Sequence, residues 1–192
     1  MSKPRFFLYR LQTDSGAAPN VHGNVCSLAI CKPVIRRSAK VGDYIIGLRG
    51  RSGDLGKLGP HATDSVLYVM RVTRKMTFAE YDAYCSAELP IKIPGPENEF
   101  VGDCQYTAAG EQRPGPHGPA HMEHDLSGKF VLLGDAAREN FWYRRDPVGV
   151  RLPADLADEW DVAGVARGHR VKAHSDKTEA RLHEWLATFP TL

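Results

Sequence analysis

The sequence predicts an α+β fold in the form of a small, partly closed β-barrel with short peripheral helices. Three observations lead to this prediction. About five to seven short runs have the apolar or aromatic character of strands, short helical segments interrupt them, and no regular long βαβ period follows. The chain has 192 residues and no internal repeat, so we expect a single domain over residues 1–192.

The strands are predicted from apolar runs that are bounded by turn residues. These runs are residues 5–11, 44–48, 66–72, 130–133 and 141–143. Between the first two runs, Pro33 opens a short helix over 33–40, because proline fits the first turn of a helix. Gly42-Asp43 then forms a tight turn into the second run.

Two further helices have local sequence signals. Thr77 and Glu80 have the spacing of a capping box, which predicts a helix over 78–85. A C-terminal amphipathic helix is predicted from near Ser175 onward, because apolar residues recur there at helical spacing. These residues are Leu182, Trp185, Leu186 and Phe189.

Two Pro- and Gly-rich segments, residues 49–64 and 90–125, are predicted to be long loops. They lack hydrophobic periodicity, and a loop longer than ~15 residues inside a compact domain is usually functional or disordered. One interpretation of the chain is therefore an interaction module whose loops dock a partner protein.

Composition and charge are those of an ordinary globular domain. Hydrophobic residues make up 42% of the chain and charged residues 25%. No apolar run approaches the ~20 residues of a membrane span and the N-terminal residues lack a secretory signal, so we expect a cytoplasmic protein without membrane contact. The four cysteines form no Cys-x-x-Cys pair and are expected to be buried free thiols. A net charge of +2 does not indicate a strongly basic nucleic-acid binder.

Local clusters of arginine nevertheless suggest a nucleic-acid surface. A guanidinium suits phosphates and base edges, and an aromatic ring can stack on a flipped base. The residues expected to contact nucleic acid are Arg36, Arg37, Trp142, Arg145 and His169, with Asn20 and Asp43 as further candidates. Each has a plainer interpretation as well: strand aromatics are mostly core, surface arginines are commonly solvated, and Asp beside Gly commonly forms a turn.

An enzyme is the alternative interpretation. An acid near a basic pocket can act as a general base, and histidine can transfer protons at neutral pH. The candidates for proton transfer are Asp14, Asp103, His124 and His169. The sequence contains no Walker loop, no dinucleotide-binding glycine motif and no zinc-deaminase motif.

The histidines of the second loop raise the question of a metal. His117, His121 and His124 lie near Glu123 and Asp125 in the sequence. Their spacing is not that of a familiar ligand pair, and the Gly and Pro content argues against a rigid helix that would preorganise a site. We therefore expect a flexible His-rich loop, no bound metal and no cofactor.

The order of motifs resembles a known family over nearly the whole chain. The motifs are Asp14-x-Gly16-x-Ala18-Pro19-Asn20, Leu28-Ala29-x-Cys31-Lys32-Pro33-x-Ile35-Arg36, Gly42-Asp43, Leu67-Tyr68-Val69-Met70-x-Val72, Phe78-x-x-Tyr81, Gly102-Asp103, His121 to Asp125, Gly128, Val131-Leu132-Leu133, Phe141-Trp142-Tyr143, Leu152-Pro153, Arg167-Gly168-His169 and a tryptophan-bearing final helix. In this order they resemble the nucleotide-modification-associated domain, type 2, of bacteria and their phages. The resemblance implies association with systems that make or handle hypermodified DNA bases, and it brings no catalytic residue set. One departure is Phe141-Trp142-Tyr143-Arg144-Arg145, where an aromatic-glycine pairing is more usual.

A weaker similarity concerns the fold. A helix, then Gly-Asp, then two strands resembles the PUA-like barrels, including the EVE and ASCH types, several of which read modified bases. The leading hypothesis from the sequence is therefore a nucleic-acid-associated protein of a DNA-modification or phage-defence system. It would recognise a modified base or nucleotide in an aromatic and arginine-lined pocket, with DNA or a nucleotide as ligand and other proteins of the system as further partners. An enzyme that makes or edits the modified base remains the alternative.

Overall fold

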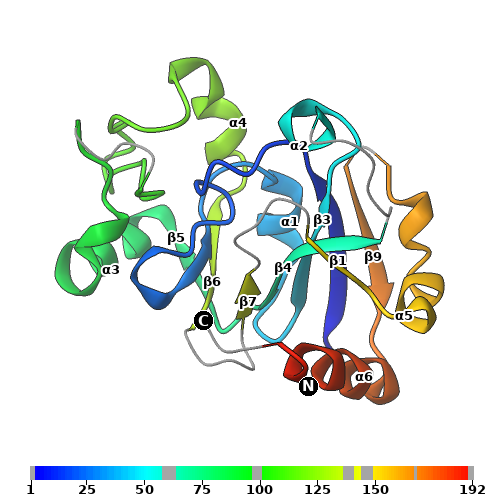
Figure 1. Ribbon diagram of the computed structural model, residues 1–192. Coiled ribbons are helices and arrows are strands. Elements are labelled where there is room, and N and C mark those ends of the chain that lie inside the picture. The colour runs from blue at the N-terminus through cyan, green and yellow to red at the C-terminus, as the bar shows by residue number, and fades with distance from the viewer. Residues whose placement is uncertain are drawn as a thin grey trace. The chain divides into compact units, whose positions relative to one another are not determined.

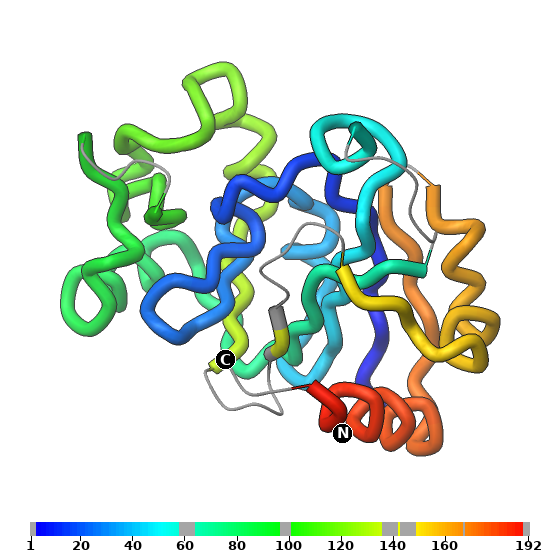
Figure 2. The backbone as a smooth tube through the Cα atoms, in the orientation of Figure 1, coloured from blue at the N-terminus to red at the C-terminus, as the bar shows by residue number. Residues whose placement is uncertain are grey.

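The computed structural model describes residues 3–57, 64–96, 101–135, 141–143, 149–166 and 168–189 (Figures 1 and 2). The chain groups into two compact units. The first unit combines Met1–Asp14, Gly42–Arg71 and Ala137–Leu192, and the second combines Ser15–Val41 and Val72–Ala136. Each unit has its own sheet and helices, so each is described separately.

The first unit is built on a mixed sheet. Its strand order is β7-β4-β3-β1-β9, and β8 also pairs with β4. Only the pairing of β1 with β3 is parallel among these strands. The strands are β1 (Arg5–Leu11), β3 (Tyr44–Arg49), β4 (Ser65–Arg71), β7 (Phe141–Tyr143), β8 (Val150–Arg151) and β9 (His169–Ala173).

Helices of the first unit complete its core. They are α2 (Gly53–Lys57), α5 (Ala154–Glu159), η4 (Val162–Gly164) and α6 (Asp176–Ala187). Apolar side chains of α5 and α6 join those of the sheet in one cluster, in which Phe6, Trp160 and Leu182 are almost completely buried. Burial of this apolar surface is the main favourable contribution to the stability of the unit.

The second unit contains a smaller antiparallel sheet with the strand order β2-β6-β5. The strands are β2 (Cys26–Leu28), β5 (Arg74–Thr77) and β6 (Phe130–Gly134). The helices are η1 (His22–Asn24), α1 (Pro33–Ser38), α3 (Phe78–Glu88), η2 (Pro90–Lys92), η3 (Pro119–His121) and α4 (Met122–Leu126). A core cluster includes Tyr81, Cys85, Val131 and Leu133, so α3 packs on β6.

These elements confirm the predicted α+β class, but the predicted partly closed barrel is not seen in the described part of the chain. The described strands form two open sheets, and no closed barrel is seen among them. Both local helix signals are confirmed. Thr77 and Glu80 form a capping box at the start of α3, and the Ser175 side chain caps α6, whose residues Leu182 and Trp185 are buried.

The two segments that the sequence predicts as loops contain short regular elements in their described parts. Helix α2 lies within 49–64, η2 and η3 lie within 90–125, and α4 begins there and ends at Leu126. An isolated antiparallel bridge joins Tyr106 to Gln112. Within the described part of the chain, no helix is both long and apolar enough to cross a membrane.

Candidate functional site

Cys31 lies in a strained turn between β2 and α1 of the second unit. Its φ angle is 58° and that of Lys32 is 43°, so two successive side-chain-bearing residues adopt left-handed backbone conformations. Such conformations cost free energy and persist where surrounding contacts enforce them. Asp125 Oδ1 accepts the Cys31 amide at 2.8 Å, and Arg36 Nε donates to the Cys31 carbonyl at 2.7 Å. Both the backbone N–H and the backbone C=O of Cys31 are therefore hydrogen-bonded to side chains.

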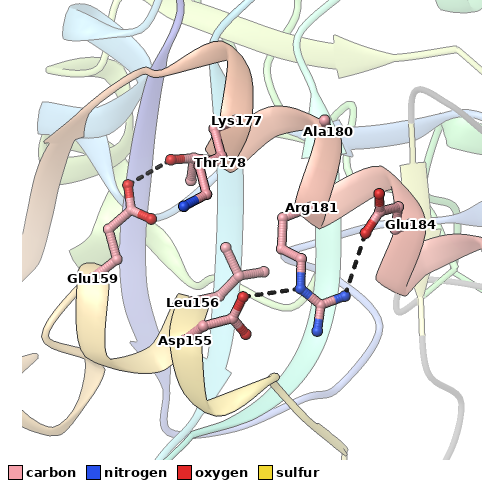
Figure 3. A pocket seen from close by; sticks show the side chains of 8 residues that line it. All are labelled: Asp155, Leu156, Glu159, Lys177, Thr178, Ala180, Arg181 and Glu184. Atoms are coloured by element: carbon pink, nitrogen blue, oxygen red, sulfur yellow. Dashed lines mark hydrogen bonds and ion pairs between the residues drawn. The ribbon is translucent and has the colours of Figure 1, made fainter.

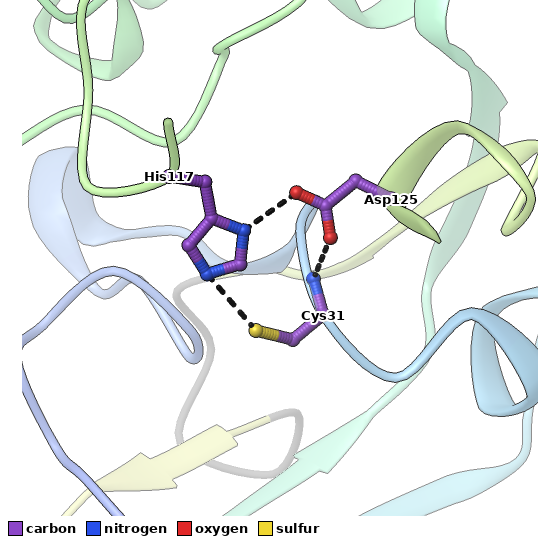
Figure 4. Close-up of side chains that lie close together, drawn as sticks. All are labelled: Cys31, His117 and Asp125. Carbon is purple, nitrogen blue, oxygen red and sulfur yellow. Dashed lines mark hydrogen bonds and ion pairs between the residues drawn. The ribbon is translucent and has the colours of Figure 1, made fainter. Parts of the chain in front are cut away.

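Three side chains meet at this turn in a linear hydrogen-bonded arrangement (Figure 4). Cys31 Sγ lies 3.4 Å from His117 Nε2. On the other side of the ring, His117 Nδ1 lies 2.6 Å from Asp125 Oδ2. Cys31 is half-buried, the His117 side chain is 18% exposed and the Asp125 side chain is fully buried, so solvent reaches the imidazole but not the carboxylate. This order of nucleophile, base and orienting acid is the arrangement of catalytic triads.

The hydrogen bonds set the charge on the imidazole. The bond to Asp125, and after it the bond to Cys31, raises the pKa of His117 to about 10. Burial acts to raise the pKa of Asp125, but the hydrogen bonds from His117 and the Cys31 amide outweigh it and leave that pKa lowered. At neutral pH the site therefore holds an imidazolium–carboxylate pair, with the positive ring beside the sulfur.

Neighbouring side chains fix the positions of His117 and Asp125. The side-chain amides of Gln105 and Gln112 both donate to the His117 carbonyl. The hydroxyl of buried Tyr106 donates to Asp125 Oδ2 at 3.0 Å. The His117 backbone and the Asp125 carboxylate are thus each held by groups other than the triad partners, which preorganises the site.

The same three side chains offer donor atoms for a metal, within 4.8 Å of one another. A metal on Asp125, however, would compete with the hydrogen bonds that its two oxygens already accept from Cys31, His117 and Tyr106. Without Asp125, one sulfur and one nitrogen remain, which is fewer than the three protein ligands of a catalytic zinc site. The geometry therefore favours the hydrogen-bonded triad.

Arg36, predicted as a nucleic-acid contact, is fully buried. Its guanidinium donates to the carbonyls of Cys31, Asp125 and Phe130. The expected contact with nucleic acid does not fit this environment, because no part of the side chain reaches the surface. Its neighbour Arg37 is exposed and donates to the Ser127 carbonyl at 2.6 Å.

Asn20 and Asp103 lie together in a buried polar network. The ammonium of fully buried Lys92 donates to Asn20 Oδ1 at 2.6 Å and to Ser27 Oγ at 2.8 Å. Asp103 accepts from Ser27 at 2.6 Å and from Tyr81 at 2.7 Å. Neither Asn20 nor Asp103 is accessible, so both have the environment of structural residues rather than of the predicted ligand contact and proton carrier.

Two candidates of the first unit have packing or turn contacts. Trp142 is 7% exposed and packs against Trp185 and Phe189. Asp43 is buried and binds both the amide and the guanidinium of Arg5 at 2.7 Å. Neither side chain is placed to take a ligand in this conformation.

The remaining candidates are more accessible. His169, in β9, is half-buried with its ring centroid 6.2 Å from that of Phe7. Asp14 is half-buried, and His124 is exposed on α4. Arg145 lies outside the described residues.

A pocket of about 400 Å³ lies between α5 and α6 of the first unit (Figure 3). Asp155, Leu156, Glu159, Lys177, Thr178, Ala180, Arg181 and Glu184 line it. Many of its polar groups bind one another: Arg181 Nε donates to Asp155 at 2.9 Å, and Glu159 accepts from Thr178 at 2.5 Å. None of the residues predicted from the sequence to form a site lines this pocket.

Sequence reasoning missed the triad because its members are far apart in the chain. Cys31 and His117 are 86 positions apart, and His117 lies in the segment that was predicted as a loop. Cys31 directly precedes Lys32-Pro33 at the predicted start of a helix, which is a local signal for an enforced turn. Nothing in the spacing of the histidines singles out His117 rather than His121 or His124.

Comparison with known proteins gives one family match. The model of the family described as nucleotide modification associated domain 2 matches residues 3–191. This match confirms the resemblance stated from the motifs. No curated protein matches.

Two solved structures share weak similarity with the chain, and both are mutants of the ZmASCH protein from Zymomonas mobilis. A serine-to-alanine mutant is 10% identical, with 96% of this chain and 99% of that chain covered and a TM-score of 0.38. A tyrosine-to-phenylalanine mutant is 9% identical, with 93% and 96% covered and a TM-score of 0.35. TM-scores this low do not establish a common fold.

Proposed function

We propose that this chain, which belongs to the nucleotide modification associated domain 2 family, is an enzyme that uses Cys31 as a nucleophile in acyl transfer on a modified base or nucleotide. The observation that carries the proposal is the hydrogen-bonded line from Cys31 Sγ through His117 to Asp125. The family supplies the link to nucleotides, and the triad supplies the reaction class. An acyl group is the substrate that a thiolate with an adjacent proton donor handles best.

In the first half of the reaction, the Cys31 thiolate attacks the carbonyl carbon of the acyl substituent. The bond from that carbon to the departing nitrogen or oxygen breaks, and the proton on His117 Nε2 passes to the leaving atom. A thioester on Cys31 and a neutral imidazole remain. The high pKa of His117 ensures that the proton is present on the ring at neutral pH.

In the second half, the neutral imidazole accepts a proton from water or from an acceptor amine. The oxygen or nitrogen attacks the thioester, the carbon–sulfur bond breaks, and the thiolate and imidazolium are restored. With water the net reaction is hydrolysis of the acyl substituent, and with an exocyclic amine it is transfer of the acyl group to a base. Asp125 keeps Nδ1 protonated and the ring oriented throughout.

Recognition of a modified base is the substrate-binding part of this proposal. The buried positions of Arg36 and Trp142 weigh against the aromatic and arginine-lined pocket expected from the sequence. Arg37 and His169 remain the accessible candidates for contacts with phosphate or base. In a protein that only binds modified bases, the strained turn, the cysteine and the oriented imidazolium would have no role. These features therefore favour the enzyme.

The test is turnover and covalent trapping with a panel of acyl-substituted nucleotides and oligonucleotides. Intact-mass spectrometry should show a Cys31 thioester that hydroxylamine removes, and Cys31→Ser should show none. Asp125→Asn should reduce turnover by about 10²–10⁴-fold, because the ring loses its orientation and tautomer. Asp135→Asn, which removes the carboxylate of another ion pair in the second unit, is the matched control. Turnover that survives Cys31→Ser would overturn the proposal.

A further inference from the structure

We infer that Arg36 is the positioning residue of the Cys31 site. It fixes the positions of Cys31, the nucleophile, and Asp125, the triad acid, by hydrogen bonds to their backbone carbonyls. The inference rests on the proposed function, because it assigns a role within that reaction. It replaces the expectation of a nucleic-acid contact with a different use of the same side chain.

The guanidinium joins the two triad members that flank His117. Nε donates to the Cys31 carbonyl at 2.7 Å, and one terminal nitrogen donates to the Asp125 carbonyl. The other terminal nitrogen donates to the carbonyl of Phe130 at 2.9 Å, at the start of β6. The rigid, planar guanidinium thus contacts the turn that carries Cys31, helix α4 that carries Asp125, and strand β6 of the sheet.

Phe78 and Gly128 leave space for the guanidinium of Arg36 between them. Its Cζ atom lies 5.5 Å from the centroid of the Phe78 ring. On the other side, a Cβ atom added at Gly128 would overlap Cζ and both terminal nitrogens. Glycine is therefore required at 128 for the guanidinium to occupy this place, and the motif list of the family resemblance contains both residues.

The positive charge is retained despite full burial. Burial lowers the pKa of Arg36 to about 10, while the nearby Asp125 carboxylate acts in the opposite direction. At neutral pH the group therefore remains a cation. Lysine in its place would present a compact ammonium without the planar fork, and cannot reproduce three N–H directions aimed at three carbonyls.

A matched control exists in the other unit. Arg10 is 4% exposed and also donates to three carbonyls, those of Val165, Arg49 and Val162, at 2.7, 2.9 and 2.9 Å. Its three carbonyl partners all belong to the first unit, whereas those of Arg36 include two triad residues. Arg10→Lys therefore measures what loss of a buried, carbonyl-bound arginine does to stability alone.

The experiment is the pH dependence of Cys31 alkylation by iodoacetamide, followed by mass spectrometry of the Cys31 peptide. Wild type, Arg36→Lys and Arg10→Lys are compared at a temperature at which circular dichroism shows each to be folded. We expect Arg36→Lys to slow alkylation at pH 7 by about tenfold or more, because misplacement of a site by about 1 Å can cost up to ~10²-fold. Arg10→Lys should lower the melting temperature and leave the profile unchanged.

Gly128→Ala is the second variant, because it retains Arg36 while a Cβ atom at 128 would overlap the guanidinium. It keeps the test decisive if Arg36→Lys does not fold, and it should also slow alkylation at pH 7. The positioning role is overturned if folded Arg36→Lys or Gly128→Ala has the alkylation profile of wild type. The proposed function then stands, provided that Cys31 reacts faster in wild type than in His117→Asn. Equal reactivity of wild type and His117→Asn would overturn the proposed function itself, and the inference with it.

Discussion

His117 forms an ion pair with the fully buried Asp125, in which Nδ1 of the imidazole lies 2.6 Å from Oδ2 of the carboxylate. The pair gives the imidazole a fixed tautomer and a positive charge at neutral pH, and it directs Nε2 towards Cys31 Sγ. A histidine that served only to fill a loop would not require a fully buried carboxylate as partner. The relationship therefore connects the fold of the second unit to a chemical role for Cys31.

The ion pair should make stability depend on pH in a defined window. The pKa of His117 is raised from 6.5 to about 10 on folding. Its contribution to stability is therefore present in full below pH 6.5 and is lost as the pH rises towards 10, while protonation of Asp125 removes it at the acid end. The free energy of unfolding in urea, measured from pH 5 to 10, should show the difference between wild type and His117→Asn shrinking above about pH 6.5. A difference that stays constant over this range would contradict the ion pair.

The cysteines should differ sharply in reactivity. Burial raises the pKa of Cys26 to about 12, and a hydrogen bond with Cys85, together with burial, raises the pKa of Cys104. Cys31 is half-buried beside an imidazolium. Limited iodoacetamide treatment of the folded protein at pH 7 should therefore label Cys31 first, because the thiolate is the reacting form. Peptide mass spectrometry reads the order of labelling, and early labelling of Cys26 or Cys104 would be the opposite result.

Asp103→Asn should destabilise the second unit without changing the reactivity of Cys31. The substitution leaves the buried Lys92 ammonium without its nearby carboxylate, which should cost about 3 kcal/mol in the free energy of unfolding. Asp135→Asn is the matched control, because Asp135 is about half exposed in its ion pair with Arg74 and should cost less than about 1 kcal/mol. Urea unfolding measures both values. Loss of turnover in folded Asp103→Asn would instead support the proton-transfer role that the sequence suggested.

Trp142→Ala should act through the core of the first unit. The indole packs against Trp185 and Phe189, with ring centroids 5.8 and 5.2 Å away. Removing it should lower the free energy of unfolding by about 3–5 kcal/mol, and Trp142→Phe should cost less. A folded Trp142→Ala protein of near-normal stability that has lost binding to a modified oligonucleotide would restore the stacking role predicted from the sequence.

The parts of the fold that were predictable are those with local causes. The Thr77–Glu80 capping box acts within one helical turn, and the apolar stripe of α6 lies on one face of one helix, so both can be read from neighbouring residues. The predicted partly closed barrel is not seen among the described strands, which form two sheets, and no local pattern reports which strands pair.

The candidate site was harder to predict than the fold. Arg36 was predicted as a nucleic-acid contact, but its residue type could not tell a phosphate contact from a guanidinium that donates to three carbonyls. His117 and Asp125 reach Cys31 only because the segment from 101 to 129 folds back on the turn before α1, and that segment has no periodicity from which its path could be inferred. Sequence patterns do not predict which long-range contacts an irregular segment of backbone makes.

Activation of Cys31 by His117 is tested by the rate of Cys31 alkylation at pH 6–7 in wild type and in His117→Asn. We expect wild-type Cys31 to react at least about tenfold faster, because only wild type holds an imidazolium 3.4 Å from the sulfur. Equal rates in the two folded proteins would show that His117 does not activate Cys31.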